Sequence, residues 1–405
     1  MIYWQEVQLH DAARTDAPIG YGIVQPGPYV RNGIPVVAIR DLPTPSLQNI
    51  HRSAPSVEAS YRRSRVTGND VLISVKGTTG RVGIVPVGFM GNISRDVARL
   101  RLRDEHEPAY WFQMLQSPQA QRTLQQAAVG STRQELSIGT LKTLSFCCPS
   151  RQGQERISAV LSDADQLIEA LKQLIVKKQA IKQGMMQDLL TAKTRLPGFN
   201  ASWRTLEAGD IGTFKGGSGF PIRYQGSVSG RFPFFKVSDM NNSGNELFMS
   251  KANNYISDGQ RKRMGAVVMP RGAIVFAKVG AAVFLERKRI LAQSSCIDNN
   301  MAAFILDNSS ADVRFVHHVL TNFPLGSLVA TGALPSLNGR QLRSIPLTIP
   351  ADLNEQRAIA AALDDVDNEI GILRQRLTKA RDVKHGMMQQ LLTGRTRLPV
   401  EEGAA

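Results

Sequence analysis

Short clusters of basic and polar side chains have the chemistry needed to contact a nucleic acid. The first part of the chain offers Arg62, Arg63, Arg65, Lys76, Thr78, Thr79 and Arg81. The second part offers Lys215, Ser218, Arg261, Lys262, Arg263, Lys278, Arg287, Lys288, Arg289, Asn338 and Arg340. Lysine and arginine neutralise phosphates and release counterions, and arginine and asparagine can also bind the edges of guanine and adenine. The sequence does not decide which of these side chains contact bases and which contact phosphates.

The charge of the chain supports this interpretation. The net charge is +15 and the pI is near 10, which indicates a polyanionic partner. Residues 1–150 carry 16 basic and 11 acidic side chains, and residues 201–350 carry 17 and 9. A single basic triplet is commonly a solvated surface, but clusters in both parts of the chain favour DNA or RNA binding.

No catalytic constellation is visible in the sequence. It has no phosphate-binding Gly-x-x-x-x-Gly-Lys loop, no His-Glu-x-x-His pair, no Gly-x-Ser-x-Gly motif and no Asp/Asn-Pro-Pro-aromatic motif. The carboxylate pairs Asp163/Asp165 and Asp365/Asp367 fall within helical stretches, where we expect solvated or capping charges. We therefore predict no catalytic residue, no metal site and no cofactor of the chain's own.

Two long helices must position these clusters, because one stretch of sequence occurs twice. Residues 154–197 and 356–399 align without a gap, and 22 of the 44 positions are identical. Apolar residues recur at steps of three and four in both copies, which is typical of a coiled-coil seam. They are Ile157, Leu161, Ala164, Ile168, Leu171, Ile175, Met185 and Leu189, and Ile359, Leu363, Val366, Ile370, Leu373, Leu377, Met387 and Leu391. We expect two helices, each about 57 Å long, that pair with each other and run antiparallel.

Lysines interrupt both seams. Lys178 and Lys182 in the first copy, and Lys384 in the second, occupy positions where the pattern calls for apolar residues. We interpret the interruption as the place where a partner or the next domain takes over. An alternative, in which each helix packs only on its own globular neighbour, stays open.

The parts before the helices are two α/β blocks with a shared plan. Residues 34–39, 70–75 and 83–87 read as strands, and 108–126 as helical. In the second block, Phe232–Asp239 corresponds to Ile34–Asp41, and Ala273–Lys278 to Val71–Lys76. We predict an α+β fold, a pseudo-two-fold tandem repeat of two α/β domains, 1–150 and 198–350, joined by two long helices, 151–197 and 351–405, that form an antiparallel coiled coil.

The sequence contains no apolar run long enough for a membrane span and begins without the features of a signal peptide. We therefore expect a cytoplasmic protein that does not contact membranes.

Both helices close on a motif that identifies a family. The first ends Leu189-Leu190-Thr191-Ala192-Lys193-Thr194-Arg195-Leu196-Pro197, and the second ends Leu391-Leu392-Thr393-Gly394-Arg395-Thr396-Arg397-Leu398-Pro399. With two variable blocks of about 150 residues, the whole chain resembles the specificity subunit of type I restriction-modification enzymes. Ala192, where the second copy has Gly394, is a small departure from the pattern.

The resemblance implies a non-catalytic subunit that determines DNA sequence specificity. Each block would be a target-recognition domain for half of a split sequence in double-stranded DNA, and the helices would set the unread gap. Two methyltransferase subunits would bring S-adenosylmethionine, and two motor-nuclease subunits would bring ATP and Mg. The target sequence and gap length cannot be deduced from the chain.

Two classes of function compete with this interpretation. The chain could be a self-sufficient DNA methyltransferase or nuclease with diverged motifs, or a coiled-coil adaptor whose basic blocks bind acidic proteins. Unaided methylation or cleavage would favour the first, and the absence of salt-dependent DNA binding would favour the second.

Overall fold

The computed structural model describes residues 4–46, 48–130, 134–329, 335–396 and 398. It consists of two compact units, Met1–Gln173 with Arg374–Ala405, and Leu174–Leu373. Each unit contains one α/β block, the first half of one long helix and the second half of the other. The predicted blocks are therefore present, but each is completed by helical segments that are distant in the sequence.

Two four-stranded sheets form the block of the first unit. One has the order β2 (Gly20–Tyr21), β10 (Val97–Leu100), β6 (Val71–Ser74) and β8 (Val82–Ile84), with antiparallel neighbours. The other has the order β4 (His51–Ser53), β3 (Ile34–Val37), β9 (Met90–Ile93) and β5 (Val66–Thr67), in which β3 and β9 run parallel. Two short pairs are β1 (Gln5–Gln8) with β12 (Ser145–Cys148), and β7 (Lys76–Gly77) with β11 (Gln134–Glu135).

The helices of this block are α1 (Leu9–Ala12), α2 (Pro55–Glu58), α3 (Pro108–Leu115), α4 (Pro118–Ala127) and α5 (Ile138–Thr143). The sequence fixes their starts locally. Pro108 and Pro118 open α3 and α4, where a missing N–H costs nothing, and the preceding Ser117 accepts a hydrogen bond from the N–H of Ala120 at 3.2 Å.

The second block has the same plan. A five-stranded sheet has the order β14 (Gly212–Gly216), β21 (Met301–Leu306), β18 (Ile274–Ala277), β19 (Lys288–Leu291) and β16 (Phe248–Met249). A three-stranded sheet has the order β17 (Tyr255–Ile256), β15 (Phe232–Phe235) and β20 (Cys296–Ile297), and β13 (Trp203–Glu207) pairs with β22 (Pro346–Pro350). The helices are α7 (Asp258–Met264), α8 (Val313–Asn322) and α9 (Gly339–Arg343).

The correspondence predicted between the blocks holds in detail. Strands β3 and β15 each pair with a parallel strand, β9 or β20, and each leads into a 3-10 turn. A carboxylate caps both turns, because Asp41 accepts from the N–H of Ala38 at 2.7 Å and Asp239 accepts from the N–H of Lys236 at 2.6 Å. The two blocks are therefore copies of one fold.

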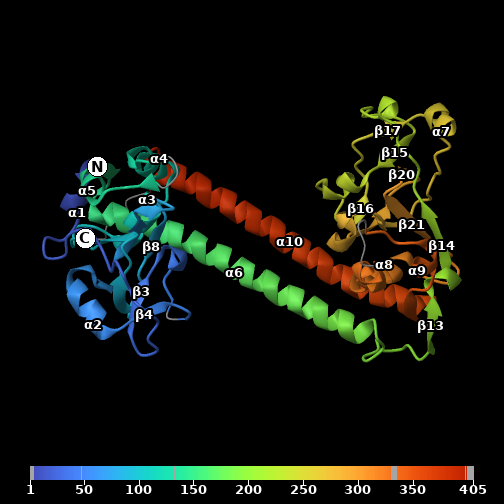
Figure 1. Cartoon of the computed structure of the whole chain (residues 1–405), viewed down its shortest axis with the longest axis horizontal. Coiled ribbons are helices and arrows are strands. Elements are labelled where there is room, and N and C mark those ends of the chain that lie inside the picture. Colours follow the sequence, from blue (N-terminus) through green and yellow to red (C-terminus); the bar gives the residue numbers. More distant parts are fainter. Residues whose placement is uncertain (1–3, 47, 131–133, 330–334, 397, 399–405) are drawn as a thin grey trace, which may run out of the picture. The chain divides into compact units, whose positions relative to one another are not determined.

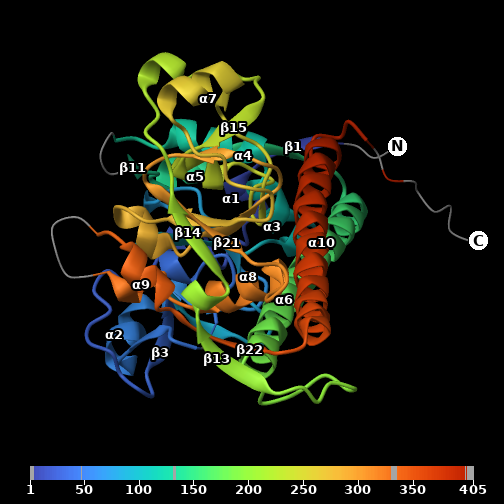
Figure 2. The same ribbon diagram turned by 90° about the vertical axis from the view of Figure 1, so that its right-hand side faces the viewer.

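The predicted long helices are α6 (Arg151–Leu189) and α10 (Leu353–Leu391), each one unbroken helix of 39 residues (Figures 1 and 2). At 1.5 Å per residue each is about 58 Å long. Most of the predicted seam is buried, but Met186 and Met388 are the buried methionines, whereas Met185 and Met387 are partly exposed. The seam thus shifts by one residue after the interrupting lysines.

The interrupting lysines join the two helices, which corrects our interpretation of them. In the first unit, the ammonium of Lys384 lies 2.7 Å from Asp165. In the second unit, Lys182 lies 2.7 Å from Asp367, and Lys178 forms an ion pair with Glu369 at 2.5 Å. At the two contacts of the second unit, residue numbers rise along α6 as they fall along α10, so the helices run antiparallel there, as they do in the first unit (Figure 1). Asp165 and Asp367 are therefore partners of lysine across the helix pair rather than simply solvated charges.

Each unit has a core that includes residues from both long helices. In the first unit, Trp111 and Tyr110 share a cluster with Ile157 and Leu161 of α6 and with Met388 and Leu391 of α10. In the second unit, Phe304 and Phe315 share a cluster with Met186 and Leu189 of α6 and with Ile359 and Leu363 of α10. Full burial of one such side chain contributes about 1.5–3 kcal/mol, so each helix packs on a block as well as on the other helix.

None of the helices in the described part of the chain is both long enough and apolar enough to cross a lipid bilayer.

Candidate nucleic-acid interface

Helix α7 carries the basic triplet of the second block. Ser257 caps it, since its hydroxyl accepts from the N–H of Gln260 at 3.2 Å, and the Gln260 side chain accepts from the N–H of Ser257 at 2.7 Å. Gly265 ends the helix with φ of 61°, in the left-handed region that glycine tolerates. Local sequence signals therefore bound this helix at both ends.

One acidic residue, Asp258, pairs with two of the three basic residues of the triplet. Arg261 donates to Asp258 at 2.8 Å, and the ammonium of Lys262 lies 3.2 Å from the same carboxylate. Arg263 forms no ion pair with a carboxylate of the described residues. One guanidinium of the triplet is thus left to a different partner.

That guanidinium lines a pocket of about 550 Å³ between α7 and the glycine-rich loop after β14. The lining residues are Gly219, Phe220, Pro221, Arg223, Arg263, Met264 and Asn299. The guanidinium of Arg223 lies 5.0 Å from the ring centroid of the adjacent Tyr224. Hydrogen bonds from Arg223 and Arg263 to the phenol lower the pKa of Tyr224. Two arginines and one tyrosine therefore converge on one opening.

The loop is held against the block by close backbone contacts. A Cβ atom on Gly217 would lie 1.8 Å from the carbonyl oxygen of Asp298, so a larger residue does not fit there. The Ser218 hydroxyl accepts from the N–H of Val267 at 3.0 Å, just beyond α7. The structure thus gives Ser218 the role of fixing the loop beside Arg263.

A corresponding pocket of about 490 Å³ lies in the first block. It is lined by Pro18, Ile19, Gly20, Tyr21, Ala59, Ser60, Tyr61, Arg62, Arg63 and Ser64. Arg62 and Arg63 are exposed and come from the 3-10 helix Ala59–Ser64, which follows α2. This pocket also combines two arginines with tyrosines.

Neighbouring hydrogen bonds fix the helical side of the first pocket. Arg65 donates two hydrogen bonds to the carboxylate of Glu58, at 2.6 and 2.7 Å, and Asn92 donates a third at 3.1 Å. The bonds from Arg65 hold the pKa of Glu58 below its usual value. Arg65 is therefore occupied by a structural ion pair, whereas neither Arg62 nor Arg63 forms one with a carboxylate of the described residues.

The two pockets share one of their two sides in the repeat. In both blocks that side is the helical segment that follows β4 or β17. The other side differs, because Pro18–Tyr21 precede and form β2 in the first block, whereas Gly219–Arg223 follow β14 in the second. The N–H of Ile23 donates to Ile93 at 2.7 Å, as the N–H of Ser218 donates to Ile297 at 2.9 Å. We call the site of each pocket the basic corner, made of Tyr21, Arg62 and Arg63 in the first block and of Arg223, Tyr224 and Arg263 in the second.

The other predicted residues of the first block lie outside its basic corner. Lys76 pairs with Glu135 at 2.9 Å, Thr79 donates to Gln134 at 3.2 Å, and Arg81 donates to the carbonyl of Leu42 at 2.9 Å. Thr78 is exposed in the turn after β7, where its carbonyl accepts from Ser74. DNA contact by these residues stays a prediction.

In the second block, Lys288 differs most from expectation. Its side chain is 1% exposed, and its ammonium contacts Glu286 and donates to the carbonyl of Phe323 at 2.9 Å. Strand β19 is mostly buried, so the ammonium of Lys288 lies inside the block rather than in solvent. We therefore withdraw Lys288 as a surface contact.

The remaining predicted residues are more varied. Arg289 is partly buried and donates to the carbonyl of Lys288, Arg287 bonds to Asn241, and Asn338 caps α9 by accepting from Arg340 and Gln341. Lys215 and Arg340 are exposed, and Lys278 directly follows β18, with its ammonium beside Gly216. These positions are not gathered into one pocket.

Tyr21, Arg223, Tyr224 and Asn299 were not among the sequence-predicted residues. No spacing in the sequence singles them out, because the corner forms only when the loop meets α7 through pairing of distant strands. The one available signal was that Arg223-Tyr224 follows the glycine-rich loop, as Gly20-Tyr21 precedes its counterpart.

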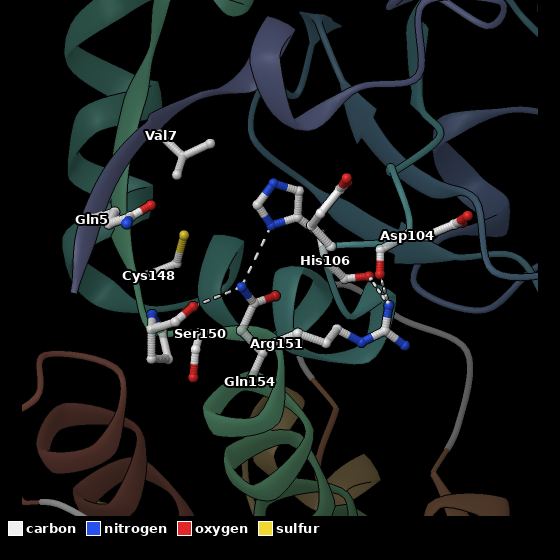
Figure 3. Close-up of a pocket in the computed structure, with 10 residues that line it drawn as sticks. Gln5, Val7, Asp104, His106, Cys148, Ser150, Arg151 and Gln154 are labelled. Carbon is white, nitrogen blue, oxygen red and sulfur yellow. Dashed lines mark hydrogen bonds between the residues drawn. The ribbon is translucent and has the colours of Figure 1, made fainter. Parts of the chain in front are cut away.

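A glutamine at the start of each long helix locks that helix to its block. Gln154 accepts from the N–H of Glu107 at 2.9 Å and donates to the carbonyl of Pro149 at 2.9 Å. Gln356 repeats both bonds with Asp312 and Pro350, at 2.8 and 2.9 Å. In the first unit, Gln154, Arg151 and His106 also line a pocket of about 520 Å³ (Figure 3).

Three side chains of the second unit could approach a metal ion, namely His318, Asp364 and Asp367. The two carboxylates already have partners within the protein, because Arg314 and His318 bind Asp364 and Lys182 binds Asp367. The hydrogen bonds from His318 and Arg314 outweigh the effect of burial and lower the pKa of Asp364 to about 2. The arrangement is that of an internal ion-pair network.

The geometry defines a class of protein, a tandem α+β repeat. It has two blocks, each with a basic corner, and one pair of long antiparallel helices whose residues complete the core of each block. A family model described as type I restriction modification DNA specificity domain matches residues 17–179 and 200–381. The chain belongs to this family. The recognised family and the predicted fold class are therefore confirmed, as is the DNA-specificity role at the level of the family.

Relatives and solved structures agree with this assignment. The chain is 28% identical over 206 residues to the type I restriction enzyme EcoBI specificity subunit of Escherichia coli, covering 50% of this chain but only 43% of that protein. It is 21% identical over 360 residues to the MjaVIII specificity subunit of Methanocaldococcus jannaschii, covering 84% and 82% of the two chains. The structure of a type I S subunit from M. genitalium superposes with a TM-score of 0.62 at 16% identity over 96% of both chains, which shows a shared fold.

Proposed function

We propose that this chain is the non-catalytic specificity subunit of a type I restriction-modification complex and reads a split sequence in double-stranded DNA. The observation that carries the proposal is that each of the two repeated blocks carries one basic corner, a pocket with two arginines beside a tyrosine. One DNA-contacting surface per block supports two half-sites.

The long helices support a fixed gap between the half-sites. Half-sites one turn of B-DNA apart are separated by roughly 34–36 Å, and each helix is about 58 Å long. Reciprocal lysine–aspartate pairs hold the helices in one register, so the gap is a property of the chain. Joining two weakly binding domains also raises affinity through effective concentration.

Catalysis belongs to partners in this proposal. Methyltransferase subunits, two per chain, would bring S-adenosylmethionine, and two motor-nuclease subunits would bring ATP and Mg. The tandem repeat supports two equivalent docking places, because each unit presents one half of each long helix. The complex would act in the cytoplasm.

Mapping of methylated bases tests the proposal. The chain is co-expressed with a cognate methyltransferase subunit in a host that lacks other DNA methylation, and the modified positions are mapped across the genome. We expect two short defined sequences separated by an undefined gap of constant length, with one methylated base in each. A single continuous target, or methylation by the chain alone, would contradict the proposal.

A further inference from the structure

We propose that each basic corner is a clamp for one stretch of DNA backbone phosphates, which positions the block without reading sequence. This inference rests on the proposed DNA binding and assigns a ligand, a phosphodiester, to residues of both blocks. The argument begins with the second block, where the contacts are more numerous.

In the second basic corner, two guanidinium groups contact a neutral phenol instead of a carboxylate. Asp258 takes up the charges of Arg261 and Lys262, at 2.8 and 3.2 Å, but Arg223 and Arg263 meet at the phenol of Tyr224. Like charges gathered around a neutral group repel each other, and an anion between them relieves that repulsion. Arginine suits a phosphate in particular, since its planar fork matches two phosphate oxygens.

The remaining lining favours a backbone over a base. The second pocket opens beside Asn299 and the backbone of Gly219, which supply polar groups at its rim. Gly219 has no side chain and open space beside it, which allows the close approach of a sugar-phosphate chain. Base readout calls for donors and acceptors fixed in a pattern, whereas these arginines are held mainly by a phenol.

The first basic corner also combines two arginines with tyrosine. Arg62 and Arg63 are exposed beside Tyr21, which is 52% exposed, and Tyr61 lines the same pocket. Glu58 is the nearest acid, but Arg65 and Asn92 occupy its oxygens. Each block thus presents two arginines beside a tyrosine, next to the helical segment that follows β4 or β17, which suits a contact that is independent of sequence.

Salt dependence of DNA binding tests the clamp. The full chain, as purified with its methyltransferase, is compared with Arg223→Ala/Arg263→Ala and with Arg62→Ala/Arg63→Ala. Each lost phosphate contact lowers the slope of log affinity against log salt by about 0.9, so we expect each double variant to lower the slope by about two. Affinity should fall equally for target and unrelated duplexes.

A matched control removes equal charge elsewhere. Arg204 on β13 and Arg271 before β18 are exposed and lie outside the corner, so Arg204→Ala/Arg271→Ala should leave the slope close to that of the wild type. Thermal unfolding and co-purification with the methyltransferase, both unchanged, verify that the variants fold.

Three results would overturn the clamp. They are an unchanged slope, an equal loss in the control, and a relaxed sequence preference in one half-target without a change in slope, which would assign the arginines to bases. These outcomes are separate from the failure of the proposed function, which would show in the wild type as a continuous target or as no DNA binding.

Discussion

Two adjacent histidines on α8 have different surroundings and different hydrogen-bond partners. His317 is buried and its Nε2 donates to the carbonyl of Lys288 at 3.1 Å, while His318 faces Asp364 at 2.7 Å. Burial lowers the pKa of His317 to about 3, and the nearby positive charges of Arg314 and Arg289 act in the same direction. His317 is therefore neutral in the folded protein at neutral and mildly acidic pH.

This histidine should make the second unit sensitive to acid. The unfolded chain binds a proton on His317 below pH 6.5, whereas the folded chain does so only near pH 3. The unfolding free energy therefore falls as the pH drops through this interval, by about 1.4 kcal/mol per pH unit for one such group. We expect His317→Gln, which can keep the bond to Lys288, to reduce the slope by about that amount.

The measurement is urea unfolding between pH 4 and 6, read from hydrogen exchange of peptides from α8. Asp364 does not interfere in this range, because its lowered pKa removes stability only between its ordinary value near 3.8 and about 2. His385→Gln, at an exposed position of α10, is the control and should keep the wild-type slope. Equal slopes in wild type and His317→Gln would show that burial does not hold this imidazole neutral.

At the scale of elements, charge specifies how α6 and α10 pair. Lys384 is 15% exposed and lies 2.7 Å from Asp165, which also accepts from Gln113 at 2.6 Å. Lys182 and Asp367 repeat the pair with the roles of the helices exchanged. A slip of either helix would leave these ammonium groups among apolar neighbours, so the pairs disfavour other registers at some cost in stability.

A double-mutant cycle should detect this coupling. Lys384→Met, Asp165→Asn and the double variant give the interaction energy of the pair, which we expect to be about 0.5–1 kcal/mol, because Asp165 is partly exposed. The exposed pair Lys172–Glu169, within α6, is the comparison and should give a smaller coupling, because solvent screens both charges. Thermal unfolding of the four proteins supplies the values, and a coupling no larger than that of the comparison pair would argue against a role in register.

The helices were predictable from sequence, and the basic corners were not. A seam of period 3.5, repeated in the sequence, predicts two long helices because helical contacts are local. The structure starts both helices within a few residues of expectation but ends them at Leu189 and Leu391, before the closing motif reaches its proline. Lys182 and Lys384 were misread because an ion pair across two helices requires knowledge of register. Arg223 and Arg263 escaped notice because strand pairing over long separations brings their segments together.

At the scale of the molecule, the duplication has made the two halves interdependent. The core of the first unit uses Met388 and Leu391 from α10, and the core of the second uses Met186 and Leu189 from α6. Deleting either half would expose these apolar residues, with a loss of about 1.5–3 kcal/mol for each. Loss of either half would therefore destabilise the unit that remains, even though the two blocks share one fold.

If the helices set the gap between half-sites, their length should determine it. Seven residues inserted in both α6 and α10 preserve the period of the seam and lengthen each helix by about 10.5 Å, at 1.5 Å per residue. Base pairs are spaced about 3.4 Å apart along B-DNA, so we expect the unread gap to grow by about three base pairs while both half-sequences stay the same. Mapping of methylated bases measures the change, and an insertion of seven residues in α6 alone is the control, since it breaks the register of the lysine–aspartate pairs and should abolish methylation. A gap that keeps its original length in an active double insertion would show that the long helices do not measure DNA.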